Sequence, residues 1–187
     1  MNQKTNLTNS KQHTRMRNTF FKLWVHGIMK VADDSVSISP DLAPIFYLDI
    51  EKRLVEQGCE VAAVGGREDH IHVLFTQNPL LTLHETMRFL QGMSQRWYHL
   101  HDFYTGYYKF HWDAGYTAYS FSESVRLRLI DFVENQDEIH SKINFYQEMQ
   151  RLNELHNVDA SDEEMQSEIA ASKGRYELRQ FAPIWEL

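Results

Sequence analysis

Cysteine is nearly absent from this chain, since only Cys59 among 187 residues carries a thiol. A single cysteine excludes an internal disulfide and a zinc cluster built on cysteines, and it favours a reducing compartment. Long apolar runs are missing too, because no stretch approaches the ~20 residues that a membrane helix needs. The N-terminal segment has no apolar core like that of a secretion signal. We therefore expect a cytoplasmic protein with no membrane association.

An overall positive charge, common among nucleic-acid-binding proteins, is also missing: the formal net charge is −7. The charge is unevenly distributed, with 14 Lys and Arg against 13 Asp and Glu in residues 1–130, and 5 against 13 in residues 131–187. Six basic residues precede the first acidic residue, Asp33. Residues 1–18 form a basic arm that can neutralise phosphates, although a solvated leader explains the same composition. Residues 151–187 form an acidic C-terminal extension.

The composition that remains is that of a globular protein, with 42% hydrophobic and 13% aromatic residues. Between the two extensions we place one domain, over residues 19–150. The residue patterns predict strands over 20–29, 60–64, 70–76 and 116–121, and helices over 39–58, 82–99 and 120–139. Capping boxes at Thr82–Glu85 and Ser120–Glu123 begin the last two helices, and Gly65-Gly66-Arg67 predicts a hairpin.

This order of elements predicts a mixed α/β (α+β) fold with a ferredoxin-like β-α-β-β-α-β sheet. The helices are expected to pack on one face of the sheet, followed by a further C-terminal helix. The apolar residues expected to face the core are Leu42, Ile45, Leu48 and Val55 in the first helix, and Leu83, Met87, Leu90 and Trp97 in the second.

The most informative segment is Asp69 to Phe75, with the sequence DHIHVLF. Successive side chains of a strand alternate between its faces, so His70 and His72 project together while Ile71 and Val73 project oppositely. Two neutral imidazoles on one face provide half of a metal site. Ordinary solvent-facing histidines explain the same pattern.

A second informative segment is FVENQ, at residues 132–136 of the last predicted helix. Phe132, Gln136 and His140 are spaced four residues apart, so they lie along one face of that helix. If this face meets the histidine strand, the amide oxygen of Gln136 becomes a third metal ligand. The other interpretation is a core phenylalanine beside two polar residues on a helix flank.

The chain resembles the HUH single-tyrosine transposases, which include the insertion-sequence single-strand DNA transposases and the REP-associated tyrosine transposases. The resemblance extends from Phe21 to Tyr146. The segments that carry it are DHIHVLF, FLQGMSQRW at 89–97, WDAGYTAYS at 112–120 and DFVENQDEIH at 131–140. It implies that His70, His72 and Gln136 bind Mg²⁺ or Mn²⁺, and that the protein acts on single-stranded hairpin DNA. It also implies a homodimer.

The chain departs from the family at the residue four before Gln136, where the nucleophilic tyrosine is replaced by Phe132. A phenolate must attack the scissile phosphate to form a 5′-phosphotyrosine, and phenylalanine has no oxygen. We therefore expect an inactive transposase-like protein. The alternatives are a silent DNA-binding regulator or domesticated remnant, and a metal-dependent nuclease that uses water with His140 as the base. A further alternative is that Tyr116, Tyr119 or Tyr146 replaces the missing nucleophile.

Basic side chains are the predicted DNA contacts. The candidates are Lys22, Arg67, Arg88 and Arg96. In the family the segment around Gly92 carries more basic residues than here, where Gln91 and Met93 are its neighbours. The aromatic residues of 103–110 and Trp112 can stack on unpaired bases, or they can form a packed loop.

Overall fold

The strands and helices of the computed structural model follow the predicted order. The structure describes residues 20–101 and 109–159. The strands are β1 (Trp24–Lys30), β2 (Val61–Gly66), β3 (His70–Thr76) and β4 (Thr117–Phe121). The helices are α1 (Ala43–Glu56), α2 (Leu83–His101), α3 (Arg126–Glu134), α4 (Gln136–His140) and α5 (Phe145–His156), with the 3-10 turn η1 (Glu123–Val125) before α3. The predicted α/β class and the β-α-β-β-α-β order are confirmed.

The four strands form one sheet in the order β2-β3-β1-β4, and every neighbouring pair is antiparallel. β2 and β3 are the predicted hairpin. Gly65 and Gly66 belong to β2 itself, so the turn lies just after them, where the backbone N–H of Arg67 donates to the carbonyl of His70 at 2.9 Å. Gly65 is paired with His72 across this hairpin.

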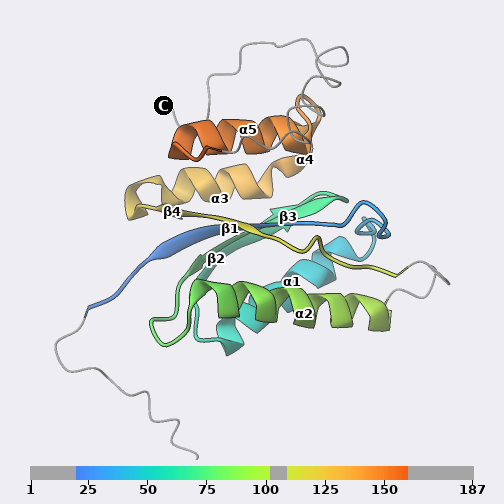
Figure 1. Cartoon of the computed structure of the whole chain (residues 1–187), viewed down its shortest axis with the longest axis horizontal. Coiled ribbons are helices and arrows are strands. Elements are labelled where there is room, and N and C mark those ends of the chain that lie inside the picture. Colours follow the sequence, from blue (N-terminus) through green and yellow to red (C-terminus); the bar gives the residue numbers. More distant parts are fainter. Residues whose placement is uncertain (1–19, 102–108, 160–187) are drawn as a thin grey trace, which may run out of the picture.

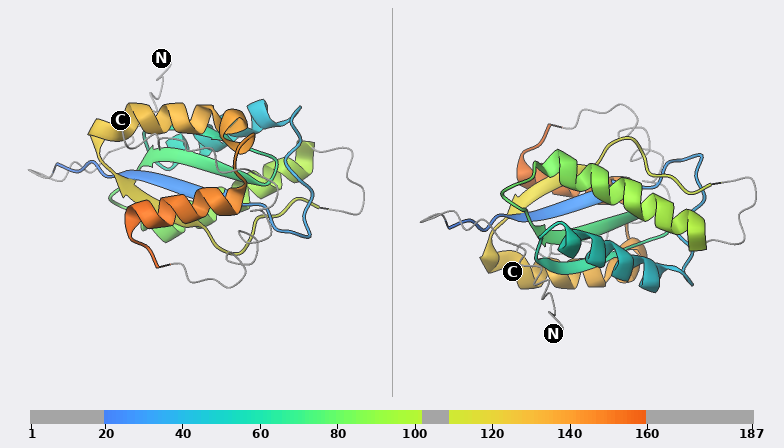
Figure 2. Two further views of the ribbon diagram at one scale, coloured as in Figure 1. Left: turned by 90° about the horizontal axis from the view of Figure 1, so that it is seen from above. Right: turned by 90° about the horizontal axis from the view of Figure 1, so that it is seen from below.

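Helices cover both faces of the sheet (Figure 1). α1 and α2 lie against one face, whereas α3 and α5 lie side by side on the other (Figure 2). The two helices of the β-α-β-β-α-β unit thus share one face, as predicted, and the helices that follow β4 cover the other. The reason is that apolar residues alternate on both sides of the strands: Val73 belongs to the α1/α2 core, and Leu74 packs with Phe132 and Val133 of α3.

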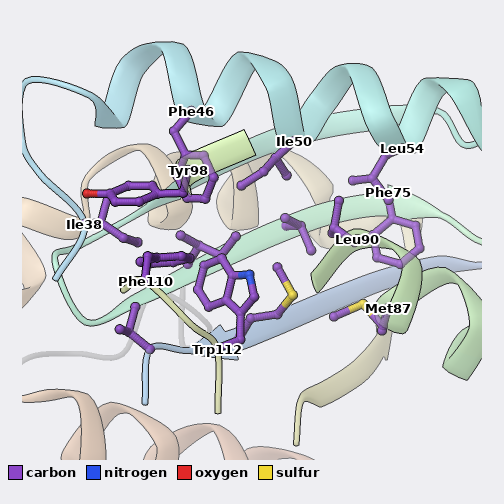
Figure 3. Close-up of a cluster of buried hydrophobic side chains, with 14 of the residues drawn as sticks. Ile38, Phe46, Ile50, Leu54, Phe75, Met87, Leu90, Tyr98, Phe110 and Trp112 are labelled. Carbon is purple, nitrogen blue, oxygen red and sulfur yellow. The ribbon is translucent and has the colours of Figure 1, made fainter. Parts of the chain in front are cut away.

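The face under α1 and α2 is the larger apolar core (Figure 3). Phe46 is at its centre, stacked on Trp97 and Trp112. Helix α1 buries Phe46, Ile50 and Leu54. The predicted apolar face was wrong at Ile45, Leu48 and Val55, which remain exposed, whereas Leu42 packs against the core as predicted. Helix α2 buries Met87 and Leu90 as predicted, with Leu83 and Trp97 partly buried.

One of the two predicted capping boxes is present. The backbone N–H of Glu85 donates to Thr82 Oγ1 at 3.1 Å, and the N–H of Thr82 donates to Glu85 Oε2 at 2.8 Å. The second box was wrong, since Ser120 lies within β4. Its expected partner Glu123 instead accepts from Trp24 Nε1 at 2.6 Å and from Arg126 Nε at 2.6 Å.

The long helix predicted after β4 is broken at Asn135, which separates α3 from α4. The side chain of Asn135 donates to the carbonyl of Asp131 at 2.7 Å, and this local bond competes with continuation of the helix. α5 then runs from Phe145 to His156, with Asn144 as its N-cap, and buries Leu152 and Asn153. The boundary predicted after residue 150 falls inside α5, and the division of the chain into domains stays a prediction.

Three of the predicted segments lie largely outside the described residues. They are the basic arm at 1–18, most of the aromatic segment at 103–110, and the acidic extension beyond residue 159. Among the helices that the structure describes, none has the length and apolar character required to cross a membrane.

Candidate metal centre

The two histidines of β3 face the α3–α5 layer, as predicted. His70 and His72 are fully buried there, whereas Ile71 and Val73 enter the opposite core. The ring centroids of the two histidines are 4.9 Å apart. The alternation of the strand therefore brings two imidazoles to one point inside the protein.

A second group orients each of these imidazoles. His70 Nδ1 is 2.6 Å from Asp69 Oδ1, and His72 Nδ1 is 2.8 Å from His26 Nε2 on the neighbouring strand β1. An Nδ1–H donated to such a partner leaves the lone pair on Nε2, the atom that binds a metal. In that tautomer the Nε2 atom of each ring carries the lone pair that would bind a metal. His26 was not among the predicted site residues.

Gln136 and His140 reach this histidine pair from α4. Gln136 Oε1 is 3.1 Å from His70 Nε2, and the Gln136 amide donates to the carbonyl of Phe132 at 3.2 Å. His140 Nε2 is 3.0 Å from Gln136 Oε1 and 3.2 Å from His70 Nε2. Although the predicted helix is broken at Asn135, the three residues spaced four apart, Phe132, Gln136 and His140, still face strand β3. The structure therefore brings together His70, His72 and Gln136.

Glu148 of α5 also lies at this site, and the sequence had not suggested it. Its Oε1 is 3.5 Å from His72 Nε2 and accepts from Gln136 Nε2 at 3.2 Å. Its Oε2 is 3.6 Å from His70 Nε2 and 3.1 Å from His140 Nε2. One atom from each of His70, His72 and Glu148 lies within 4.8 Å of the others. The only indication in the sequence is that Glu148 shares a helix face with Phe145, Met149 and Leu152.

The charges of the site are set by burial and by these contacts. Burial lowers the pKa of His72, and the nearby Glu148 carboxylate only partly opposes this effect. Burial would raise the pKa of Glu148, but His72 and His140 hold it well below its usual range. Burial also lowers the pKa of His140, yet the adjacent Glu148 carboxylate outweighs it and raises this pKa. A neutral His72 beside an ionised Glu148 is the combination that a metal ion requires.

The donor chemistry of this cluster fits a divalent cation. Two buried atoms, His72 Nε2 and Glu148 Oε2, make no hydrogen bond with any residue that the structure describes. His70 Nε2 and Gln136 Oε1 also face each other, and both are acceptors when the neutral imidazole carries its proton on Nδ1. Electron pairs that converge without a proton between them repel, and a cation relieves this repulsion. His70, His72 and Gln136 would hold the ion, with Glu148 at the same point.

Phe132 stands beside the histidines at the position expected for the nucleophile. Its ring is edge-on to His72, with centroids 5.6 Å apart, and 6.1 Å from His26. The side chain is buried together with Leu74 and Val133. The aromatic volume expected of the nucleophile is therefore present without a hydroxyl group.

The predicted DNA contacts are dispersed over the molecule. Arg67 is next to the cluster and pairs with Asp137, the neighbour of Gln136. Arg88 and Arg96 lie exposed on α2, on the far side of the sheet. Lys22 precedes β1 and pairs with two glutamates, Glu60 and Glu123.

Two aromatic residues predicted as stacking candidates are instead part of the core. Phe110 and Trp112 are buried beneath α1, edge-on to each other with ring centroids 4.8 Å apart. Neither ring is available to a base. Of the two alternatives, packing therefore holds for these two residues, and the apolar contacts of the core explain why aromatic residues occur there.

The family follows from a comparison with known protein families. A family model described as "Transposase IS200 like" matches residues 19–136 of the chain, which include β1 to β4 and the whole segment from His70 to Gln136. This chain belongs to the IS200-like transposase family. The resemblance to HUH tyrosine transposases is thereby confirmed. No curated protein matches this transposase-family chain.

Two solved structures are similar to this chain. A putative transposase from Deinococcus radiodurans superposes with a TM-score of 0.52 at 20% sequence identity, covering 65% of this chain and 96% of that one. The structure of a REP-associated tyrosine transposase bound to a REP hairpin gives a TM-score of 0.48 at 11% identity, covering 67% of this chain and 73% of that one. The first similarity shows that this transposase-family chain shares the fold of the Deinococcus protein.

Proposed function

We propose that this transposase-family protein binds single-stranded hairpin DNA and holds Mg²⁺ or Mn²⁺ at His70, His72 and Gln136, but does not cleave the DNA. Membership of the transposase family supports DNA as the partner. The convergence of three predicted ligands at one buried point supports the metal. The phenylalanine at the nucleophile position supports the loss of cleavage.

The observation that carries this proposal is the place of Phe132. Its ring borders His72, and its backbone carbonyl accepts from the side chain of Gln136, so it is joined directly to the proposed ligands. A phenol at this position would attack phosphorus through its oxygen, the P–O3′ bond would break, and the 3′-oxygen would leave with a proton. A bound divalent ion would supply positive charge to a phosphate oxygen. Without the phenol oxygen, no bond to phosphorus can form here.

Arg67 is the basic side chain nearest to the proposed ligands, because it pairs with Asp137 beside Gln136. A guanidinium can hold a phosphate with two hydrogen bonds. We assign it the phosphate nearest to the site. The homodimer implied by the family is also part of this proposal, and light scattering in solution decides between twice the mass and a monomer of 22.2 kDa.

The test is to restore the hydroxyl group with Phe132→Tyr. The full chain is incubated with labelled single-stranded hairpins and Mn²⁺, and protein-bound DNA is measured under denaturing conditions. We expect the unmodified protein to shift the hairpin on a native gel without a covalent adduct. Phe132→Tyr should give a metal-dependent adduct, because only a hydroxyl is added to a ring already in place.

Two controls interpret this test. Phe121→Tyr adds the same hydroxyl outside the cluster, in the ring that stacks on Trp24, and should give no adduct. His70→Ala combined with Phe132→Tyr should also give none. An adduct formed by the unmodified protein, or free ends without attached protein, would contradict the proposal and favour another tyrosine or water as nucleophile.

A further inference from the structure

We propose that Glu148 is itself a metal ligand, which makes a four-ligand site with His70, His72 and Gln136 and fixes α5 over it. This inference rests on the proposed metal site and adds a residue from outside the segment that matches the family, which ends at residue 136. In a metal site with only three protein ligands, water or a phosphate supplies the fourth ligand. Here the carboxylate of Glu148 supplies it.

The spacing of the donor atoms matches a single ion. Ligands about 2.1 Å from a metal lie about 3.0 Å apart at a right angle and about 3.4 Å apart at the tetrahedral angle. His70 Nε2 is 3.1 Å from Gln136 Oε1 and 3.6 Å from Glu148 Oε2. His72 Nε2 is 3.5 Å from Glu148 Oε1. These separations need little change to accommodate an ion in the centre.

The hydrogen bonding of Glu148 leaves it with unused capacity. Oε1 accepts from Gln136, whereas the buried Oε2 makes no hydrogen bond among the described residues, although His140 Nε2 is only 3.1 Å away. A buried carboxylate is costly unless it is paired and fully hydrogen-bonded. A cation between Glu148 and the histidines provides that compensation.

The packing of α5 explains how this carboxylate reaches the interior. The helix begins with a capping box in which Asn144 Oδ1 accepts from the N–H of Gln147 at 2.9 Å. Its apolar face then packs Phe145, Met149 and Leu152 on Ile28 and Tyr119. Glu148 projects from this same apolar face and is only 1% exposed. A charged residue on the buried face of an amphipathic helix requires a specific partner.

The resulting ligand set is buried. His70 and His72 have no exposed surface, and Gln136 is 2% exposed. Four protein ligands fill the positions of a tetrahedral ion, whereas an octahedral ion such as Mn²⁺ keeps two further positions for water or a phosphate oxygen. Because two ligands are imidazoles, the set favours a transition ion such as Mn²⁺ over Mg²⁺. The bound ion therefore joins α5 to β3.

Isothermal titration of the metal-free full chain with MnCl₂ tests this inference. We expect Glu148→Gln to weaken Mn²⁺ binding by about 10- to 100-fold or more, since loss of a supporting group alone costs that much. Glu154→Gln removes an exposed carboxylate from the same helix and should bind like the unmodified protein. Equal binding by Glu148→Gln and the unmodified protein would overturn the inference.

His72→Ala separates this inference from the proposed function. If His72→Ala loses Mn²⁺ binding while Glu148→Gln keeps it, the metal site stands and the role of Glu148 fails. If His72→Ala also binds normally, the metal site itself fails.

A second measurement uses only the unmodified protein, in case Glu148→Gln does not fold. Hydrogen exchange should slow in α5 as well as in β3 when Mn²⁺ is added, because the ion links the two elements. Slowing in β3 with unchanged exchange in α5 would overturn the inference.

Discussion

The two faces of the sheet differ sharply in chemistry although the same strands build both. The face under α1 and α2 buries aromatic and aliphatic side chains around Phe46. The face under α3, α4 and α5 buries three histidines, a glutamine and a glutamate next to smaller apolar clusters. Burial of apolar surface stabilises the first face directly, whereas the polar groups of the second face are stable only with partners. The comparison indicates that one face stabilises the fold and the other carries the site.

The largest expected effect is on the apolar face. Phe46→Ala should lower the free energy of unfolding by about 3–5 kcal/mol, because it leaves a cavity among the surrounding aromatic rings. Phe46 is fully buried and stacks on Trp97 with ring centroids 5.3 Å apart. Denaturant titration measures the change. If this face only stabilises the fold, Mn²⁺ should raise the free energy of unfolding of Phe46→Ala by as much as it does for the unmodified protein.

Leu48→Ala is the matched control on the same helix. Leu48 is 63% exposed, so its loss should change stability by no more than about 0.5 kcal/mol. A comparable loss in both variants would mean that the outer stripe of α1 is also covered, which would contradict the division between the faces.

A smaller effect is expected where α3 approaches the sheet. Gly65 lies opposite His72, and a Cβ at Gly65 would stand 2.3 Å from the carbonyl oxygen of Val133. Gly65→Ala should therefore push α3 away and cost about 1–3 kcal/mol. It should also weaken Mn²⁺ binding, because Gln136 follows directly after this helix. Denaturant titration and calorimetry measure the two effects.

Gly92→Ala is the control for this variant. Gly92 lies within α2, and a Cβ there would meet nothing within 4 Å. Alanine should raise stability by up to about 1 kcal/mol, since glycine is unfavourable inside a helix. Unchanged Mn²⁺ binding in Gly65→Ala would show that the site does not depend on the close approach of α3.

The sequence predicted best what depends on local pattern. The alternation of β3 fixed the shared face of His70 and His72, and the Thr82–Glu85 box marked the start of α2. It failed where tertiary packing decides. Helix α1 has two apolar stripes, and periodicity cannot choose between Ile45 and Phe46. The rings of α2 and of the segment before β4 decide in favour of Phe46.

Part of the candidate site was equally beyond the sequence. His70, His72 and Gln136 came from a recognisable spacing, which the structure brings to one place. Glu148 could not be recognised in this way, because a glutamate in a helix is normally solvated and its partners are far away along the chain. His26 was missed for the same reason, since only the pairing of β1 with β3 brings it near His72.

The most direct test of the central claim is an anomalous-scattering map from crystals of the full chain grown or soaked with MnCl₂. The division between the faces predicts one strong peak on the α3–α5 side of the sheet, within about 2.0–2.5 Å of the Nε2 atoms of His70 and His72. The Gln136 amide oxygen should lie at a similar distance. An ordered, Mn²⁺-saturated crystal with no peak between these histidines would contradict the account and leave the cluster as a buried polar network.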